Sequence, residues 1–433
     1  MNSNMTLTCM VCDGETDCRF GYSNRAYQPL SFACPHCASL ICVTMDTSRP
    51  PRTEFQYEGC QPSKEQRGIF IDDKNPFVDL HLDFPVRFGK YVPGLTPYMM
   101  AMQELHQASD SHEEALEKMQ FHNERLTQLN YFHDRAEEIK SIIRLYSGEN
   151  KQLFIKRVGN FLKQDQGLSL KHQDVNAALY RFLTFVFLPF VNFGEVKYLV
   201  EQFGDLTIGL ASKPFDDFVR RIVDAGFLGT LQKDCLKLYP EVYAAELAIR
   251  PALYLDLISG YEKAKTAARI STKDFQSYKD LFKDIIEVLG RQLVLVAGIN
   301  NILHRKDSNA FATISGGTLS SLEKFAAKTI SEKFKYLDDC WYTIEREIVD
   351  TEVRNSIAHN NVNYDEVTQI IEYFPNGGGI QSTLGQQIYF LDFMRILLMA
   401  FREMNNLHHL VKCLYYYEYL ILQNPDHKKR TET

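Results

Sequence analysis

The sequence predicts a mainly α-helical protein that begins with a small cysteine-rich β module. Seven of its ten cysteines lie within the first 60 residues, among glycines and turn-forming residues. From about residue 98 onward, apolar residues instead recur at the spacing of amphipathic helices, and strand patterns are scarce until residues 366–374. A chain of 433 residues is long enough for two or three domains with a full hydrophobic core.

The net charge and the apolar segments bear on nucleic-acid binding, secretion and membrane insertion. The formal net charge is −7, so the chain has no overall basic field, and any nucleic-acid site must be a local basic patch. The N-terminus lacks the charged start and apolar block of a secretory signal. The most apolar run, 182–193, is too short to span a membrane and contains Pro189, so we expect a buried helix that ends near the proline. These features predict a cytoplasmic protein with no membrane partner.

The first segment, residues 1–65, contains two Cys-x-x-Cys pairs. Cys9 and Cys12 form the first pair, and Cys34 and Cys37 form the second after 21 intervening residues. Two such turns can supply the four thiolates that a tetrahedral structural metal site needs. Without a secretory signal, paired cysteines indicate metal rather than disulfides. The segment therefore predicts a zinc ribbon with its linker, holding one structural Zn²⁺ per chain.

Neighbouring residues leave alternatives to this ligand set open. Cys18, His36 and Cys42 are close enough in sequence to compete for the metal, although His36 lies inside a Cys-x-x-Cys turn, where a side chain normally points away. A metal-free, cysteine-rich turn region and a redox pair are further alternatives. A catalytic zinc is not expected, because four cysteine ligands leave no open position. The pattern does not reveal what the ribbon binds.

The middle of the chain is predicted to contain a connection followed by a helical domain. Residues 66–97 contain Asn-Pro and Pro-Gly breaks and predict an irregular or extended connection. Residues 98–268 predict a helical domain. Its longest pattern, 111–147, predicts one long helix that begins with a capping box of Ser111 and Glu114.

The remainder, 269–425, predicts a second helical domain before a polar tail at 426–433. Two long helical patterns, 272–304 and 319–340, open this domain. The strand pattern 366–374 then ends in the turn sequence PNGGG, which favours a β-hairpin. A last long helix is expected from about Gln386 to Leu422.

The stretch RNSIAH brings an arginine, an asparagine and a histidine together before this hairpin. On a helix, Asn355 and His359 share a face, and Arg354 lies about 140° around from His359, so only its long side chain, or a neighbouring subunit, brings it near. Histidine can move protons near neutral pH, and a guanidinium can stabilise the oxygens of a phosphorane-like transition state. Asn355 could orient the imidazole or the phosphate. This chemistry suits metal-free RNA cleavage through the 2′-hydroxyl.

The motif resembles the signature of the HEPN superfamily: arginine, a polar residue, three to five further residues and histidine. The resemblance covers about residues 270–422 and implies a compact four-helix bundle, here with a small hairpin insertion. It also implies a catalytic set of Arg354, Asn355 and His359, with two motif copies meeting in one cleft of a homodimer through the C-terminal helices. HEPN nucleases leave a cyclic phosphate, and many serve as toxins or in phage defence.

Two interpretations follow from these patterns. The first is an endoribonuclease acting on RNA, in which the helical middle region and the ribbon select RNA or restrain activity, with a regulatory protein partner as a further expectation. The second is a non-catalytic, HEPN-like dimer that binds a ligand or protein, with the ribbon as a docking module. The trio would then be an ordinary polar helix start. A similar pattern, Arg402 with His408 and His409, lacks the polar residue after arginine and predicts only a helix face.

Overall fold

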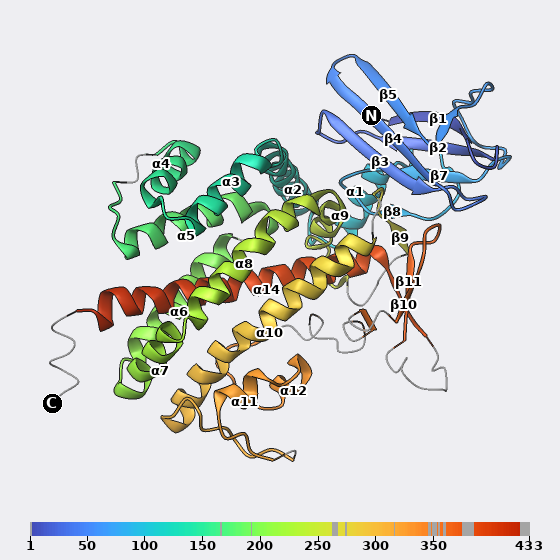
Figure 1. Cartoon of the computed structure of the whole chain (residues 1–433). Coiled ribbons are helices and arrows are strands. Elements are labelled where there is room, and N and C mark those ends of the chain that lie inside the picture. Colours follow the sequence, from blue (N-terminus) through green and yellow to red (C-terminus); the bar gives the residue numbers. More distant parts are fainter. Residues whose placement is uncertain are drawn as a thin grey trace. The chain divides into compact units, whose positions relative to one another are not determined.

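The protein has a mainly α-helical fold with small sheets at its N-terminus, as the sequence predicts (Figure 1). Contacts divide it into unit 1, which comprises residues 1–131, 244–280 and 352–398, and unit 2, which comprises residues 132–243, 281–351 and 399–433. The computed structural model describes residues 2–164, 167–191, 193–261, 267–272, 275–315, 317–344, 348, 353, 356–357, 361–374 and 385–424.

Unit 1 opens with two sheets. The first has the strand order β6-β1-β2-β7, with β1 and β2 antiparallel and β7 parallel to β2, and the second has the order β3-β4-β5. The strands are β1 Asn2–Cys9, β2 Glu15–Gly21, β3 Tyr27–Ala33, β4 Leu40–Arg49, β5 Arg52–Glu58, β6 Cys60–Pro62 and β7 Phe77–Leu80.

The two sheets share one apolar core. Phe20 of the first sheet and Phe32 and Val43 of the second belong to a single buried cluster, which Val78 and Leu80 of β7 complete. The segment 66–97, expected as an irregular or extended connection, therefore supplies a strand to the module. Its short apolar alternation is enough for one strand, because β2 provides a ready edge for parallel pairing.

Further elements complete unit 1. Helix α1 begins with Thr96 as its N-cap, whose side chain accepts a hydrogen bond from the Met99 amide. The three strands that follow residue 361 form an antiparallel meander, a larger element than the expected hairpin. The bounds are α1 Pro97–Gln107, α2 His112–His133, α9 Glu246–Leu255, β8 Val86–Arg87, β9 Ala268–Arg269, β10 Val362–Asp365, β11 Ile370–Tyr373 and β12 Gln386–Tyr389.

A buried ion cluster holds the β module of unit 1 against its helices. The Arg250 guanidinium of α9 is completely buried and donates to Asp83 Oδ1 at 2.8 Å and to Glu246. Glu246 also accepts from Arg25, in the loop between β2 and β3, at 3.0 Å. Burial disfavours the charged form of Asp83, but the neighbouring Arg250 holds the pKa of Asp83 below its usual value. Each charge is thus paired by an opposite one from a different part of unit 1.

Unit 2 is built from helices alone among the described residues, apart from a single β-bridge between Ile314 and Gly317. The pattern 111–147, expected as one helix, is divided between α2 and α3. Both helices keep an apolar face, so the periodicity continues across the polar turn at 134–135 and does not reveal the break. The bounds are α3 Ala136–Ser147, α4 Lys151–Leu162, α5 His172–Phe187, α6 Phe193–Gly209, α7 Lys213–Asp224, α8 Phe227–Ala244, α11 Leu322–Ala326 and α12 Ile330–Phe334.

The apolar run 182–193 contains the end of a buried helix, as predicted: α5 ends at Phe187 and passes into a short 3-10 turn, Leu188–Phe190. The pattern 319–340 forms the short helices α11 and α12 rather than one long helix. One described helix, α10 (Phe275–Arg305), is long and apolar enough to cross a membrane, and 89% of its most apolar window is buried within the protein.

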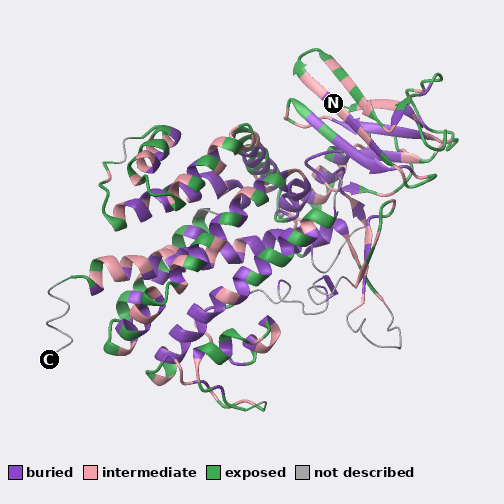
Figure 2. Ribbon diagram, viewed as in Figure 1, coloured by how far each residue is buried: buried purple, intermediate pink, exposed green. Residues whose placement is uncertain are grey.

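Helices α10 and α14 (Phe390–Tyr416) extend through both units and contact each other in each (Figure 2 shows that most of α14 is buried). In unit 1, the rings of Tyr278 and Phe390 stack with centroids 5.9 Å apart. In unit 2, the buried Gln292 amide donates to the Met404 carbonyl at 3.0 Å. Helix α14 starts at Phe390 because residues 386–389, expected as its first turn, form β12 instead.

The second arginine–histidine pattern belongs to the packing of α14. Arg402 donates from Nε to the Phe190 carbonyl at 2.7 Å, and His408 Nδ1 lies 3.0 Å from the Tyr239 hydroxyl. His408 and His409 are buried, and burial lowers the pKa of His409 to about 3. Both imidazoles are therefore neutral core groups near neutral pH, in line with a structural role.

Replacing Arg250 tests the ion cluster. Arg250→Ala should lower the free energy of unfolding by about 3–5 kcal/mol, because it leaves Asp83 and Glu246 buried without their counter-ion. Lys90→Ala is the control, because the Lys90 side chain is 77% exposed and its loss should change the value by no more than about 0.5 kcal/mol. Urea unfolding followed by circular dichroism measures both. Equal stability of the two variants would contradict a supporting role for the cluster.

Candidate functional site

The four predicted cysteines meet at one point of the β module. Cys9 ends β1 and Cys12 lies in the turn that follows, and Cys34 and Cys37 lie in the turn after β3. Their sulfurs all lie within 4.8 Å of one another, and the Cys9–Cys37 and Cys12–Cys34 pairs are each 3.8 Å apart. Such edges match a tetrahedron whose centre lies about 2.3 Å from each sulfur. The cluster could therefore hold one metal ion.

The two turns have the same backbone design. In the first, the Asp13 amide donates to the Cys9 carbonyl at 3.0 Å, and in the second, the Ala38 amide donates to the Cys34 carbonyl at 2.9 Å. Asp13 and Ala38 both adopt the left-handed conformation, with φ of 56° and 60°. This conformation ends each turn so that the following strand can return alongside the first, while both thiols stay on the inner side of the turn.

The competing ligands point elsewhere. Cys18 is fully buried in the module core, and the His36 ring packs over Gly14, where an added Cβ would lie 2.5 Å from the ring. His36 Nε2 lies 2.9 Å from the Glu15 carbonyl. Cys42 is not a member of the sulfur cluster in the part of the chain that the structure describes. The four sulfurs that meet are therefore those that the spacing predicts, and the missing Cβ at Gly14 leaves room for the His36 ring.

The thiols of the cluster differ in acidity. The Ser39 hydroxyl, 3.3 Å from Cys37 Sγ, and the Ser39 amide lower the pKa of Cys37 to about 6. Burial raises the pKa of Cys34 to about 12. The difference follows position, since Cys34 is buried and Cys37 lies on the solvent side. Cys37 can thus bind a cation as a thiolate at neutral pH, and the ion would then supply the charge that favours ionisation of the others.

Supporting residues around the cluster were not anticipated. Ser39, through its bonds to Cys37, and Gly14, through its contact with His36, shape the site without binding the ion. The signal for Gly14 was present, because Asp-Gly directly after a Cys-x-x-Cys pair is a strong turn sequence. No sequence pattern predicts the contact of Ser39 with Cys37, because that contact depends on the direction of the Ser39 hydroxyl in the second turn.

The predicted catalytic residues Arg354, Asn355 and His359 lie outside the described residues. Their described neighbours Val353, Ser356 and Ile357 are helical and buried. Positions i, i+3 and i+4 of a helix share one face, which accounts for the common burial of these three residues.

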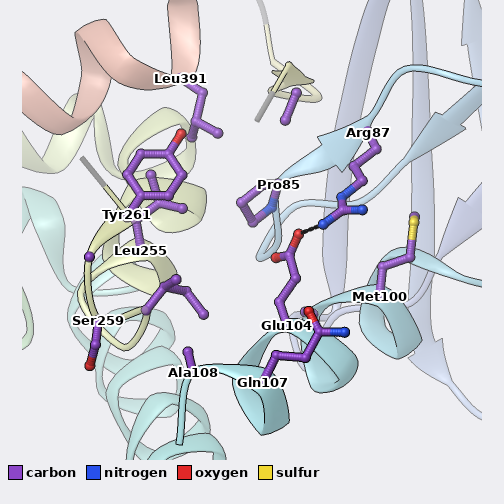
Figure 3. A pocket seen from close by; sticks show the side chains of 14 residues that line it. Pro85, Arg87, Met100, Glu104, Gln107, Ala108, Leu255, Ser259, Tyr261 and Leu391 are labelled. Atoms are coloured by element: carbon purple, nitrogen blue, oxygen red, sulfur yellow. Dashed lines mark hydrogen bonds and ion pairs between the residues drawn. The ribbon is translucent and has the colours of Figure 1, made fainter. Parts of the chain in front are cut away.

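A separate cavity of about 260 Å³ lies within unit 1 (Figure 3). Arg87 of β8 and Glu104 of α1 form an ion pair on one side, and Leu255 and Tyr261 line another. The Tyr261 hydroxyl donates to Asp392 at 2.9 Å. Because these polar groups are paired with one another, the described lining residues present no unmatched charge that would select a ligand.

Comparisons with protein-family models, curated proteins and solved structures found no match to this chain.

Removing one thiol should test the metal centre. Wild-type protein should contain one metal ion per chain, and Cys34→Ser should lose it, because a hydroxyl is a poor substitute for a thiolate and three ligands remain. Cys42→Ser is the matched control and should retain a full complement. Elemental analysis of extensively dialysed protein provides the readout. A metal-free wild type, or full retention in Cys34→Ser, would contradict the assignment.

Proposed function

We propose that the protein is a metal-independent endoribonuclease of the HEPN type. The proposal rests on the sequence motif of Arg354, Asn355 and His359, whose residue types match the needs of RNA cleavage through the 2′-hydroxyl. In this reaction the 2′-oxygen attacks the adjacent phosphorus, the 5′-oxygen leaves, and a 2′,3′-cyclic phosphate forms. We infer a role as a toxin or phage-defence effector from the same resemblance.

Each motif residue has a distinct task in this proposal. His359 moves a proton, either from the attacking hydroxyl or to the leaving oxygen, because imidazole titrates near neutral pH. Arg354 stabilises the negative charge that develops on the phosphorane oxygens. Asn355 orients the imidazole or the phosphate. One chain supplies one motif imidazole, so a second copy of the protein is expected to supply the other proton-transfer group.

The described structure is compatible with this placement. The motif follows α10 and precedes α14, the two long helices that contact each other in both units. Val353, Ser356 and Ile357, the described residues beside the motif, are buried. The meander β10-β11-β12 occupies the position of the expected hairpin insertion.

We further propose that the ion at the cysteine cluster is zinc and that its role is structural. Four thiolate ligands in tetrahedral arrangement are typical of structural Zn²⁺ sites. A closed ligand shell leaves no position for water or a phosphate oxygen, so the ion stabilises the turns after β1 and β3 rather than the reaction. RNA cleavage then depends on the motif residues alone.

One observation favours the second candidate, a non-catalytic interaction module that docks through the ribbon. Met10 and Val11, at the tip of the first metal-binding turn, are 67% and 69% exposed. Apolar residues held out on a rigid turn suit contact with a protein partner. This surface is also compatible with a nuclease that a regulatory partner restrains, so RNA cleavage itself distinguishes the two candidates.

Substitutions at the motif test the nuclease proposal. His359→Ala should reduce RNA cleavage by roughly 10²–10⁴-fold, and Arg354→Ala should reduce it by roughly 10²–10³-fold. Asn355→Ala should cost less. Cleavage should persist in EDTA and fail on 2′-deoxy substrates, since the missing hydroxyl is the nucleophile.

Two described residues provide the controls for these variants. His304 is exposed at the end of α10, and the Arg220 side chain on α7 is 43% exposed. His304→Ala and Arg220→Ala should cleave at the wild-type rate. They are better controls than Arg402→Ala, because the Arg402 side chain is only partly exposed and donates to the Phe190 carbonyl, whereas the exposed His304 ring lies 3.2 Å from the Asp339 carbonyl. Unchanged activity in His359→Ala, or cleavage of DNA, would favour the interaction module.

The proposal also predicts an assembly. We expect a homodimer, or a larger even assembly, through the C-terminal helices, because cleavage requires both a base and an acid and each motif has one histidine. Light scattering on the active preparation measures the mass in solution. A strict monomer with full ribonuclease activity would contradict this arrangement.

A further inference from the structure

Unit 2 contains an apolar groove that the proposed function does not use. It has a volume of about 240 Å³ and lies between α6 and the C-terminal end of α14, which continues into a π-helical turn, Tyr417–Leu422. Helix α6 contributes Val200 and Ile208, and the π-helical turn contributes Leu420 and Ile421. Irregular helical turns of this kind often occur at functional sites.

A glycine in the middle of α6 keeps the groove open. A Cβ added at Gly204 would meet no atom within 4 Å, so neither close packing nor an unusual backbone conformation requires glycine here. Glycine inside a helix costs about 0.8–1.0 kcal/mol relative to alanine. Gly204 therefore lowers the stability of α6, and no contact in the described chain at this position compensates for that loss.

One cation faces this groove without an oxygen partner. Lys412 lines the groove and is partly buried, and its ammonium lies 5.8 Å from the ring centre of Tyr180 and 5.9 Å from that of Tyr416. Among the described residues it has no ion pair or hydrogen bond. Burial lowers the pKa of Lys412, the neighbouring Cys413 thiol opposes this shift, and Arg181 adds to it.

We propose that this groove binds a small amphipathic carboxylate, with its apolar chain along Val200, Ile208 and Leu420 and its anionic head at Lys412. The apolar walls remove the chain from water, and the head supplies the counter-ion that Lys412 lacks among the described residues. The volume limits the chain to a short or medium length.

Charge and exposure support this occupant over others. Ile208 and Leu420 are 65% and 50% exposed, so the groove is accessible from solvent. A cationic or neutral amphiphile would leave Lys412 unpaired. In the chain's own last residues, 425–433, the three cations Lys428, Lys429 and Arg430 outnumber the carboxylates of Asp426 and Glu432, so these side chains carry no net negative charge to match Lys412. The cavity of unit 1 differs in this respect, because its Arg87 is already paired with Glu104.

Octanoate is the probe that tests the proposal. Titration calorimetry on the full chain should show one octanoate bound per chain, at least tenfold more tightly than octanol, and no binding of octylamine at the same concentrations. Lys412→Met should weaken octanoate binding by roughly tenfold or more, since it removes a charge-assisted hydrogen bond but keeps an apolar stem. Lys412→Arg should remain within about threefold of wild type.

Two further variants separate binding from folding. Gly204→Leu should abolish octanoate binding by filling the groove, with an unchanged or higher melting temperature. Lys197→Met, on the same helix but 67% exposed and near Glu201, should bind as wild type does. Absence of octanoate binding to wild type, equal affinity for octanol, or unaltered binding in Lys412→Met would overturn the proposal. None of these measurements depends on ribonuclease activity.

Discussion

The Arg250 guanidinium sits in unit 1 with no exposure to solvent, and the elements around it are arranged to satisfy its charge. Asp83 follows β7, Glu246 begins α9, and Arg25 extends the cluster from the loop after β2. An unpaired ion in this position would strongly destabilise the fold, so the fold must place both carboxylates beside the Arg250 guanidinium. This requirement explains why residues 77–83 are not an irregular connection: they complete the module core with β7 and place Asp83 beside Arg250.

The cysteine cluster lies at the other end of the strands, where the two sheets also need a contact that holds them together. The turns after β1 and β3 belong to different sheets, and few apolar residues are available at their tips, where Met10 and Val11 are exposed. Four converging thiols allow a metal ion to join the two turns where a hydrophobic contact is lacking. The left-handed residues Asp13 and Ala38 give both turns the same shape, so the ligand positions are set by backbone geometry as well as by cysteine spacing.

Sequence patterns predicted the features that depend on local chemistry. The meeting of four cysteines followed from two Cys-x-x-Cys pairs, and the buried end of α5 followed from an apolar run that contains Pro189. Features that depend on distant partners were not predicted. The role of β7 requires the free edge of β2, the break between α2 and α3 is hidden by continuous apolar periodicity, and the groove depends on space beside Gly204. Arg354, Asn355 and His359 were selected from sequence chemistry and lie outside the described residues.

The proposed reaction has a chemical signature that separates it from other routes of RNA hydrolysis. Attack by the 2′-hydroxyl retains the phosphate on the upstream fragment as a ring, whereas attack by water activated elsewhere produces other ends. The most direct measurement is mass spectrometry of the fragments from a defined RNA oligonucleotide cleaved by the purified full chain in EDTA. The account predicts a 2′,3′-cyclic phosphate on the upstream fragment and a 5′-hydroxyl on the downstream one. Fragments that carry a 3′-hydroxyl and a 5′-phosphate, or RNA that remains intact, would contradict it.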